Sequence, residues 1–272
     1  MKEFENTFGS TSRLSTTQID ERGIAPGNLV LPGISDFKRE LVPERKIPFN
    51  GLLTNKLLAA LPGSAFARLL PHLEPVSLVG NQTIYGFGDN IGYAYFPETA
   101  VITHIYFLED GSTTAAAIIG NEGMVGLSAI LEAGAQSYAT QVTIGGSALK
   151  IDIDTLKKEF ALGGPVQQVL LNYTGHRLAQ LSQKAVCNGR HKLEERLCTW
   201  LLMVHDRAGQ NRLRLTHEQI AHHLGARRAG ITDSCNNLRR GNIIHYRRGV
   251  IRIVNRELLE HAACECYASF RF

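Results

Sequence analysis

Residues 216 to 241 constrain the fold more than any other stretch, because they have the pattern of two short helices joined by a tight turn. Thr216 stands at the N-cap position of the first helix, and Gln219 follows three residues later, as a capping box requires. Gly225 ends this helix, since glycine takes a positive φ without a Cβ penalty. The segment therefore predicts a helix-turn-helix.

The second predicted helix, at about 227 to 240, has one apolar stripe and one free polar face. Ile231, Cys235 and Leu238 recur at spacings of four and three, which places them on the buried side. The free face begins with two arginines, Arg227 and Arg228. The first turn of a recognition helix contacts base edges in the DNA major groove, so this face is a candidate for DNA reading.

A β-hairpin is predicted directly after this helix. The runs at 243–246 and 250–253 are rich in β-forming residues and flank Arg247, Arg248 and Gly249. An arginine-bearing wing beside a recognition helix reaches neighbouring phosphates, which fix register without carrying sequence information. The alternative is an ordinary small α/β subdomain with solvated arginines.

The segment also resembles a known family, the Crp-Fnr transcription regulators. The match runs from Thr216 to Ile244 without a gap and includes Ile220, the turn glycine Gly225 and the wing entry at 242–244. The resemblance implies that the second helix docks in the major groove of double-stranded DNA. It also implies RNA polymerase as a further partner if the chain is an activator.

In that family an arginine, a glutamate and a second arginine on the recognition helix read the operator. Here only the first position matches, at Arg228, while Ala229 and Asp233 occupy the other two. The resemblance therefore carries over the docking mode but not the operator sequence. The candidate DNA-binding residues are Thr216, Arg227, Arg228, Ala229, Thr232, Asp233, Arg239, Arg247 and Arg248.

Charge is unevenly distributed along the 272 residues, a length that suggests two domains. Residues 187 to 272 contain 15 Lys and Arg against 8 Asp and Glu, whereas residues 1 to 186 contain 14 against 17. A basic C-terminal third behind a mildly acidic body is typical of nucleic-acid binding confined to one domain. No apolar run approaches the roughly 20 residues of a membrane helix, so we expect a cytoplasmic protein without a membrane partner.

Between about 74 and 152, turn signals recur at roughly ten-residue intervals, which predicts a β-roll or jelly-roll barrel. The expected strands are 82–85, 93–96, 101–107, 113–119, 139–143 and 147–152. The predicted fold class is thus α+β. Its parts are a flexible tail at 1–48, a β-roll sensor-like domain with flanking helices at 49–164, a dimerisation helix at 165–188, and a winged helix-turn-helix domain at 189–272.

In the cyclic-nucleotide-binding members of the family, a glycine and glutamate bind the ribose and an arginine binds the phosphate. Here the glycine matches Gly126, the glutamate position is Leu127, and no Lys or Arg occurs between Arg68 and Lys150. An enclosed phosphate without a cation is strongly disfavoured, so the resemblance is to a branch with a degenerate pocket. A regulator responsive to a cyclic nucleotide remains the alternative.

If the roll holds a ligand, its identity is unknown, and the candidate pocket residues are Glu122, Gly123, Gly126, Ser137 and Tyr138. Glu122 could bind a hydroxyl group. The simpler interpretation is that it caps a helix beginning near Met124, because negative charge is favourable at a helix N-terminus.

Pro165 opens a stretch of about 24 residues with apolar side chains at spacings of three, four and seven. A helix this long needs a partner surface, and in the family that surface is the dimer seam. The candidate seam residues of a homodimer are Val169, Tyr173, Arg177 and Leu181. The alternative is packing on its own barrel alone. A hinge is expected at Asn188-Gly189.

A metal-dependent barrel enzyme is the alternative of another class. Such sites need clustered histidines and a carboxylate, and the predicted barrel offers only His104, so we expect no catalytic residue and no enzyme. His261, Cys264 and Cys266 are spaced to chelate, but a second pair of ligands is absent nearby in sequence. We therefore expect no metal and no cofactor, with all five cysteines reduced.

Overall fold

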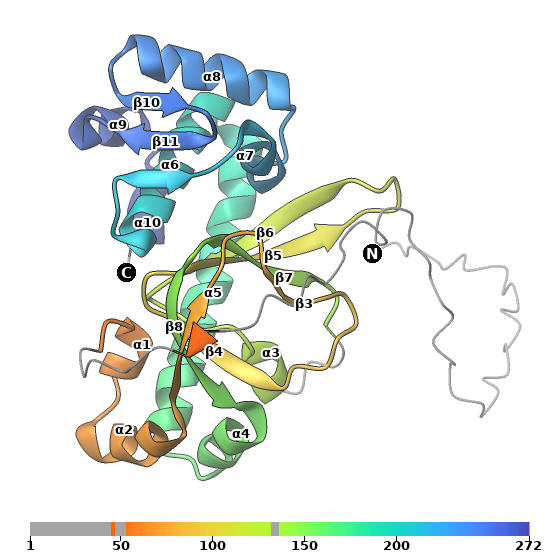
Figure 1. Cartoon of the computed structure of the whole chain (residues 1–272), viewed down its shortest axis with the longest axis vertical. Helices are drawn as coiled ribbons and strands as arrows, with labels where there is room; N and C mark the ends of the chain where they lie inside the picture. The colour runs from red at the N-terminus through yellow and green to blue at the C-terminus, as the bar shows by residue number, and fades with distance from the viewer. Residues whose placement is uncertain (1–44, 47–52, 132–135, 272) are drawn as a thin grey trace, which may run out of the picture.

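The computed structural model describes residues 45–46, 53–131 and 136–271, and it confirms the α+β fold class. Figure 1 shows a β-roll in the lower part, a C-terminal domain in the upper part and the long helix α5 running between them. The predicted flexible tail at 1–48 lies outside the described residues, except for β1 (Arg45–Lys46), which pairs with β2.

The described strands of the β-roll form two antiparallel four-stranded sheets, in the orders β1-β2-β8-β4 and β3-β7-β5-β6. All six predicted strands are present, each end within one residue of its expected position. β2 has no counterpart in the prediction, because Pro75 resembles a turn signal although proline is tolerated near a strand's beginning. The strands are β2 (Glu74–Leu78), β3 (Thr83–Tyr85), β4 (Tyr93–Pro97), β5 (Val101–Phe107), β6 (Thr113–Ile119), β7 (Ala139–Ile144) and β8 (Gly146–Asp152).

Short helices cover the outer face of the first sheet. Strand alternation turns Tyr95 and Ala148 into the roll, whereas Phe96 and Leu149 point outward and are buried beneath the helices. Both faces of β4 and β8 are therefore apolar. The covering elements are α1 (Lys56–Ala59), α2 (Gly63–Leu69), the 3-10 helix η2 (Leu70–His72), α3 (Leu127–Ile130) and α4 (Ile153–Ala161).

Helix α5 (Pro165–Arg190) begins with proline at its first turn, as predicted, and runs for 26 residues. It continues through the expected hinge at Asn188-Gly189, and the chain leaves helical geometry at His191 instead. No helix in the described part of the chain is both long and apolar enough to cross a membrane, because α5 carries polar side chains on every turn.

One side of α5 packs against the chain's own β-roll. Val169 and Tyr173 pack in the core beneath the first sheet, and Tyr173 is 3% exposed. Arg177 donates from Nη1 to the backbone oxygen of Ile118 on β6 at 3.1 Å. Three of the four predicted seam residues therefore face their own domain, and burial leaves Tyr173 no surface for a partner.

The opposite side of α5 presents a separate apolar stripe. Leu171 and Leu178 are 48% and 62% exposed, and seven residues correspond to nearly two turns, so both lie on one face. Leu181 and Val186 extend the stripe at 41% and 55% exposure. Of the predicted seam residues, Leu181 alone belongs to this stripe.

The C-terminal domain packs around helix α6 (Leu193–Ala208), whose inner face includes Leu197 and Leu201. The same apolar core contains Val101 and Ile118 of the roll, so the two domains share one buried interior. The remaining elements are β9 (Arg212–Arg214), α7 (His217–Leu224), α8 (Arg228–Arg240), β10 (Ile244–Arg247), β11 (Val250–Ile253), α9 (Arg256–Ala262) and α10 (Cys266–Phe270).

A buried ion pair joins the two domains. Arg207 on α6 donates from Nε to Oε1 of Glu122 at 2.8 Å, and the two side chains are 4% and 2% exposed. The other carboxylate oxygen of Glu122 accepts the backbone N–H of Gly120 at 3.1 Å. The expectation that Glu122 caps a helix is wrong, because the nearest helix begins at Leu127 with Gly126 as its N-cap.

The turn that carries Glu122 has glycines where its neighbours approach most closely. A Cβ on Gly120 would collide with the side chain of Arg207, and a Cβ on Gly123 would collide with the phenol of Tyr173. The Tyr173 hydroxyl accepts the backbone N–H of Met124 at 3.2 Å. The turn therefore packs closely between α5 and α6.

Helix α7 docks on the roll through His223. Its Nε2 lies 3.4 Å from the Thr143 hydroxyl on β7, and its ring lies 4.7 Å from that of Trp200. Burial, together with the charges of Lys184 and His222, lowers the pKa of His223 to about 3. The ring is therefore neutral near pH 7, so its burial at the apolar interface between α7 and the roll leaves no charge uncompensated.

We predict that Arg207→Met destabilises the protein by about 3–5 kcal/mol, because it leaves the Glu122 carboxylate buried and unpaired. Adding Glu122→Gln should recover most of this loss, since no buried charge then remains. Urea unfolding of both variants measures the difference.

The matched control is Arg68→Met, which breaks the pair of Arg68 with Glu159, in which the arginine side chain is 45% exposed. That change should cost no more than about 1 kcal/mol. Equal losses for Arg207→Met and Arg68→Met would contradict the importance of the interdomain pair.

Candidate DNA-binding surface

The helix-turn-helix forms from the capping signals of the sequence. The Thr216 hydroxyl accepts the N–H of Gln219 at 3.2 Å, and the Gln219 side chain returns a bond to the Thr216 N–H at 2.8 Å. Gly225 ends α7 at a φ of 57°. Arg196 on α6 donates to the backbone oxygen of Leu224, which satisfies a carbonyl at the end of α7. These contacts set the angle between α7 and α8.

Helix α8 divides into a buried and an exposed side, as predicted. Ile231, Cys235 and Leu238 are at most 2% exposed and anchor the helix to the domain core. Ala229 and Asp233 lie on the exposed side, as does Arg239 in the last turn. Figure 1 shows α8 at the outer edge of the molecule, at the end opposite α4. The exposed side is therefore free for a large partner.

Arg228 begins α8, with Arg227 as the N-cap residue, and both side chains are exposed. The Arg228 Nε lies 3.9 Å from a carboxylate oxygen of Glu218 on α7, and the Arg228 side chain is 72% exposed. An exposed pair at this distance is weak. The guanidinium can therefore exchange Glu218 for a base edge or a phosphate at little cost.

Thr232 is partly buried, and its hydroxyl makes hydrogen bonds within the domain. Its hydroxyl lies 2.9 Å from Nδ1 of His217 and donates to the backbone oxygen of Arg228 at 3.1 Å. The His217 ring stacks on Tyr246 of the wing, with centroids 4.2 Å apart. Burial, together with the charge of Arg228, lowers the pKa of His217. This chain of contacts links α7, α8 and the wing into one rigid unit.

The wing turns through Arg248 and Gly249, which have φ values of 49° and 72°. Two successive positive φ values match the right-handed twist of a two-residue hairpin. The turn projects the exposed side chains of Arg247 and Arg248 beyond β10 and β11. The predicted arginine-bearing wing is therefore present beside α8.

A basic sheet face extends the wing and was absent from the sequence-based prediction. Arg212 and Arg252 are directly paired across β9 and β11, and both are exposed. Like charges facing each other destabilise a sheet unless an anion lies between them. The basic sheet face consists of Arg212, Arg214, His245, Arg247 and Arg252.

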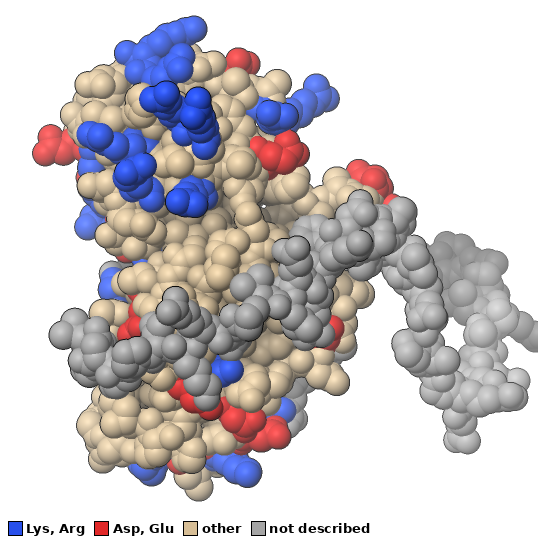
Figure 2. All heavy atoms as spheres, viewed as in Figure 1, with Lys and Arg blue, Asp and Glu red and all other residues tan. Residues whose placement is uncertain are grey.

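Figure 2 shows the blue side chains of Lys and Arg gathered over the upper, C-terminal domain on the viewed face, with Asp and Glu more frequent below. This separation of charge matches the asymmetry of the sequence. A polyanion is thus attracted to one end of the molecule.

The predicted ligand residues of the roll face different neighbours. Glu122 and Gly123 contact α6 and α5, whereas Gly126 lies against the backbone of β4. The Tyr138 ring stacks on His104 at 4.2 Å, and Ser137 is exposed. Contacts within the protein therefore already engage Glu122, Gly123 and Tyr138.

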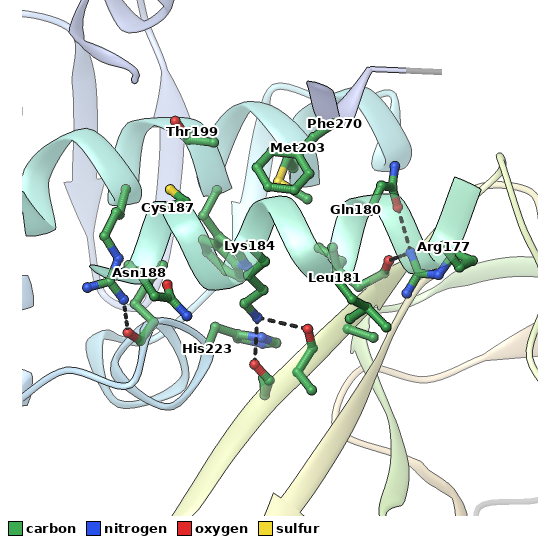
Figure 3. A pocket seen from close by; sticks show the side chains of 17 residues that line it. Arg177, Gln180, Leu181, Lys184, Cys187, Asn188, Thr199, Met203, His223 and Phe270 are labelled. Carbon is green, nitrogen blue, oxygen red and sulfur yellow. Dashed lines mark hydrogen bonds between the residues drawn. The ribbon is translucent and has the colours of Figure 1, made fainter. Parts of the chain in front are cut away.

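A cavity lies between α5, β6 and α6 (Figure 3), and sequence reasoning did not anticipate it. Two cationic side chains of α5 border the cavity, and both donate hydrogen bonds to backbone carbonyls of β6. Arg177 donates to the oxygen of Ile118. Lys184 donates to the oxygens of Ala115 and Ala116 at 2.6 and 3.0 Å. Burial, with the charges of Arg196 and Arg177, lowers the pKa of Lys184 to about 8. The remaining lining is largely apolar.

Residues 195–262 match the sequence profile of the Crp-like helix-turn-helix domain. The chain carries a Crp-like helix-turn-helix domain. The matched residues include α7, α8, β10 and β11 of the surface described above.

Solved structures share the architecture of this chain at low sequence identity. FixK2 from Bradyrhizobium japonicum is 22% identical, with a TM-score of 0.59 over 71% of this chain and 98% of that chain. A Crp-family regulator from Thermus thermophilus is 17% identical, with a TM-score of 0.57 over 69% and 95%. The regulator CLP from Xanthomonas campestris, described as responsive to c-di-GMP, is 15% identical, with a TM-score of 0.57 over 71% and 99%. No curated protein sequence matches the chain.

We predict that Arg228→Ala weakens operator binding by about 1–3 kcal/mol and relaxes base preference at one position, as expected for an arginine that reads a base edge. Arg247→Ala should instead weaken binding to all sequences alike and lower the salt slope by about one, as expected for an arginine that holds a phosphate. Fluorescence anisotropy on operator and random DNA at several salt concentrations separates these outcomes.

The control is Lys158→Ala on α4, which removes the same charge at the far end of the molecule and should change neither binding. Equal losses on operator and random DNA for Arg228→Ala would refute a base-reading role.

Proposed function

We propose that this chain is a DNA-binding transcription regulator that acts as a homodimer on a palindromic operator, with one α8 in each of two major grooves. The observation that carries the proposal is the second apolar side of α5. The helix already buries one side in its own roll, so the exposed stripe of Leu171, Leu178, Leu181 and Val186 is available to a second copy.

The spacing of this stripe fits a helix pair. Leu171, Leu178 and Ala185 recur every seven residues, with Leu181 three positions after Leu178, which is the repeat of a two-stranded seam. A two-fold axis along this seam would duplicate the C-terminal domain symmetrically. The half-sites would then be inverted repeats centred about 34 Å apart, one turn of DNA.

Within each half-site, we assign base reading to the first turns of α8, and in particular to Arg228. The wing arginines and the basic sheet face hold phosphates on either side. Ala229 and Asp233 replace charges that the family uses for reading, so the operator sequence differs from that of family members with the complete set. This assignment of base and phosphate contacts rests on the exposure of these arginines and on their positions on α8, the wing and the sheet.

We further propose that the β-roll does not take cyclic AMP. Residues 69–149 contain no Lys or Arg. Arg177 and Lys184 of α5, which lie beside β6, already donate hydrogen bonds to its backbone carbonyls. A phosphate within the roll would find no cation among residues 69–149 and would remain uncompensated unless backbone amides bound it. An effector of this regulator would therefore be neutral or bound through backbone amides.

Leu178→Glu should dissociate the dimer and abolish operator binding together, because it would bury a charge in the seam. Sedimentation velocity and an operator-binding assay on the same sample measure both effects. Leu162→Glu is the matched control, since Leu162 is the C-cap residue of α4, is 73% exposed and lies outside the stripe. A monomeric variant that still binds a full palindrome at wild-type affinity would end the dimer proposal.

Millimolar cyclic AMP or cyclic GMP should leave the melting temperature unchanged. A ligand specific to the folded state adds about 2.7 kcal/mol at a hundredfold excess over Kd, so binding would raise the melting temperature by several degrees. Such a rise, abolished by Ser137→Ala, would overturn the proposal for the roll.

A further inference from the structure

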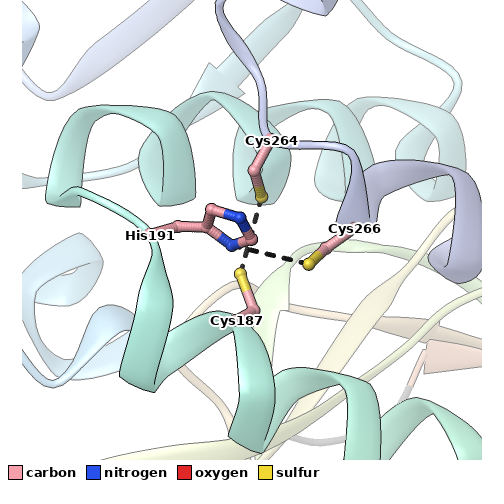
Figure 4. A group of neighbouring side chains, drawn as sticks. All are labelled: Cys187, His191, Cys264 and Cys266. Atoms are coloured by element: carbon pink, nitrogen blue, oxygen red, sulfur yellow. Dashed lines mark hydrogen bonds between the residues drawn. The ribbon is translucent and has the colours of Figure 1, made fainter.

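Four side chains with metal-binding atoms converge where α5 ends (Figure 4). Cys187 lies in the last turn of α5 and His191 is the C-cap residue of that helix, whereas Cys264 lies between α9 and α10 and Cys266 begins α10. One donor atom from each side chain lies within 4.8 Å of all the others. The three cysteines are at most 6% exposed. The His261 expected from the sequence does not belong to this group, because its ring contacts the backbone oxygen of Glu257.

The distances between these atoms suit one tetrahedral ion. The sulfurs of Cys187 and Cys264 are 3.5 Å apart, and the sulfur of Cys266 is 3.5 Å from Nδ1 of His191. Metal–sulfur bonds of about 2.3 Å and metal–nitrogen bonds of about 2.0 Å at tetrahedral angles require ligand separations of about 3.5 to 3.8 Å. Little rearrangement is therefore needed to admit an ion.

The histidine is oriented by a second contact. The Nε2 of His191 lies 3.1 Å from a carboxylate oxygen of Glu265, which leaves Nδ1 directed at the cysteines. A carboxylate behind the ligating imidazole fixes its orientation and raises its basicity as a ligand in many metalloproteins.

The sulfurs also receive hydrogen bonds from the surrounding protein. The Gln183 amide donates to the Cys266 sulfur at 3.0 Å, and the Thr199 hydroxyl lies 3.0 Å from the Cys264 sulfur. The same Thr199 oxygen accepts the Cys264 backbone N–H at 3.2 Å, so its own proton is free for the sulfur. Donors of this kind stabilise thiolates.

We propose that Cys187, His191, Cys264 and Cys266 bind one divalent ion of the zinc class in tetrahedral coordination. Binding displaces the protons of the three thiols to solvent, and the dication compensates the buried thiolates. Soft sulfur ligands with one imidazole favour zinc over magnesium or calcium. Lys184, which borders the same cavity as Cys187, lies near the excess negative charge.

Two other chemistries fit the same atoms less well. A disulfide between Cys187 and Cys264 would leave the convergence of Cys266, His191 and Glu265 without a role. An iron–sulfur cluster places inorganic sulfide and more than one iron between its ligands, and donor atoms within 4.8 Å of one another leave room for a single ion.

The ion would connect parts of the chain that are far apart in sequence. Cys187 and Cys264 are separated by 77 residues, and almost the whole C-terminal domain lies between them. Closing a loop of this length restricts the unfolded chain more than the folded one. The ion would also hold α10 against the end of α5, where the C-terminal domain begins.

The direct test is the metal content of the full-length protein, purified under reducing conditions without a metal-affinity resin or chelator. Inductively coupled plasma mass spectrometry should find one zinc ion per chain. After exchange into Co²⁺ under anaerobic conditions, the protein should show the visible d–d bands of tetrahedral cobalt and thiolate-to-cobalt charge transfer. Removal of zinc by a chelator should lower the melting temperature by several degrees, and Zn²⁺ but not Mg²⁺ should restore it.

Matched variants separate the site from general effects of losing a thiol. Cys264→Ser should lose the zinc and the cobalt spectrum, whereas Cys235→Ser, which changes a buried cysteine on α8 outside the cluster, should keep both. His191→Cys should retain the ion with a cobalt spectrum shifted toward four thiolates, which shows binding even if another variant folds poorly.

Three results would overturn the proposal. The first is a wild-type protein free of zinc that gives no tetrahedral cobalt spectrum. The second is a Cys187–Cys264 disulfide in protein isolated from reducing cytoplasm, with no metal bound. The third is acid-labile sulfide with iron in place of zinc.

Discussion

The buried pair of Glu122 and Arg207 is the interaction on which the relation of the two domains depends. Each charge would be costly to bury alone, so the turn at 120–123 and helix α6 stabilise one another only when the domains are in contact. Gly120 and Gly123 permit that contact, because any larger side chain would push α5 and α6 away. The position of the DNA-binding surface is thereby coupled to the integrity of the roll.

The features that sequence analysis predicted correctly are those encoded locally. The strand period of the roll, the capping box at Thr216 and the apolar stripe of α8 each involve residues within one or two turns or strands. Glu122 could not be interpreted in this way, because its partner is 85 residues away. The cysteine cluster had the same difficulty, since its two halves lie at the opposite ends of the C-terminal domain.

Helix α5 shows a different limit of sequence reasoning. Apolar residues lie on two of its sides, and periodicity alone does not say which side packs on the roll. Val169 and Tyr173 face inward, while Leu171 and Leu178 are exposed, so three of the four seam residues expected from the sequence lie on the side that packs against the roll. Arg212 and Arg214 were missed because β9 has only three residues, too few for a strand signal.

We propose that two copies of the α8 and wing surface read an inverted repeat. Hydroxyl-radical footprinting on a fragment selected from genomic DNA by the purified protein tests it most directly, because it maps backbone contacts at single-nucleotide resolution. We expect two protected half-sites on one face of the duplex, centred about 34 Å apart, each flanked by weaker protection from the wing. A single protected patch without symmetry, or protection that does not depend on sequence, would rule out reading of an inverted repeat by two copies of this surface.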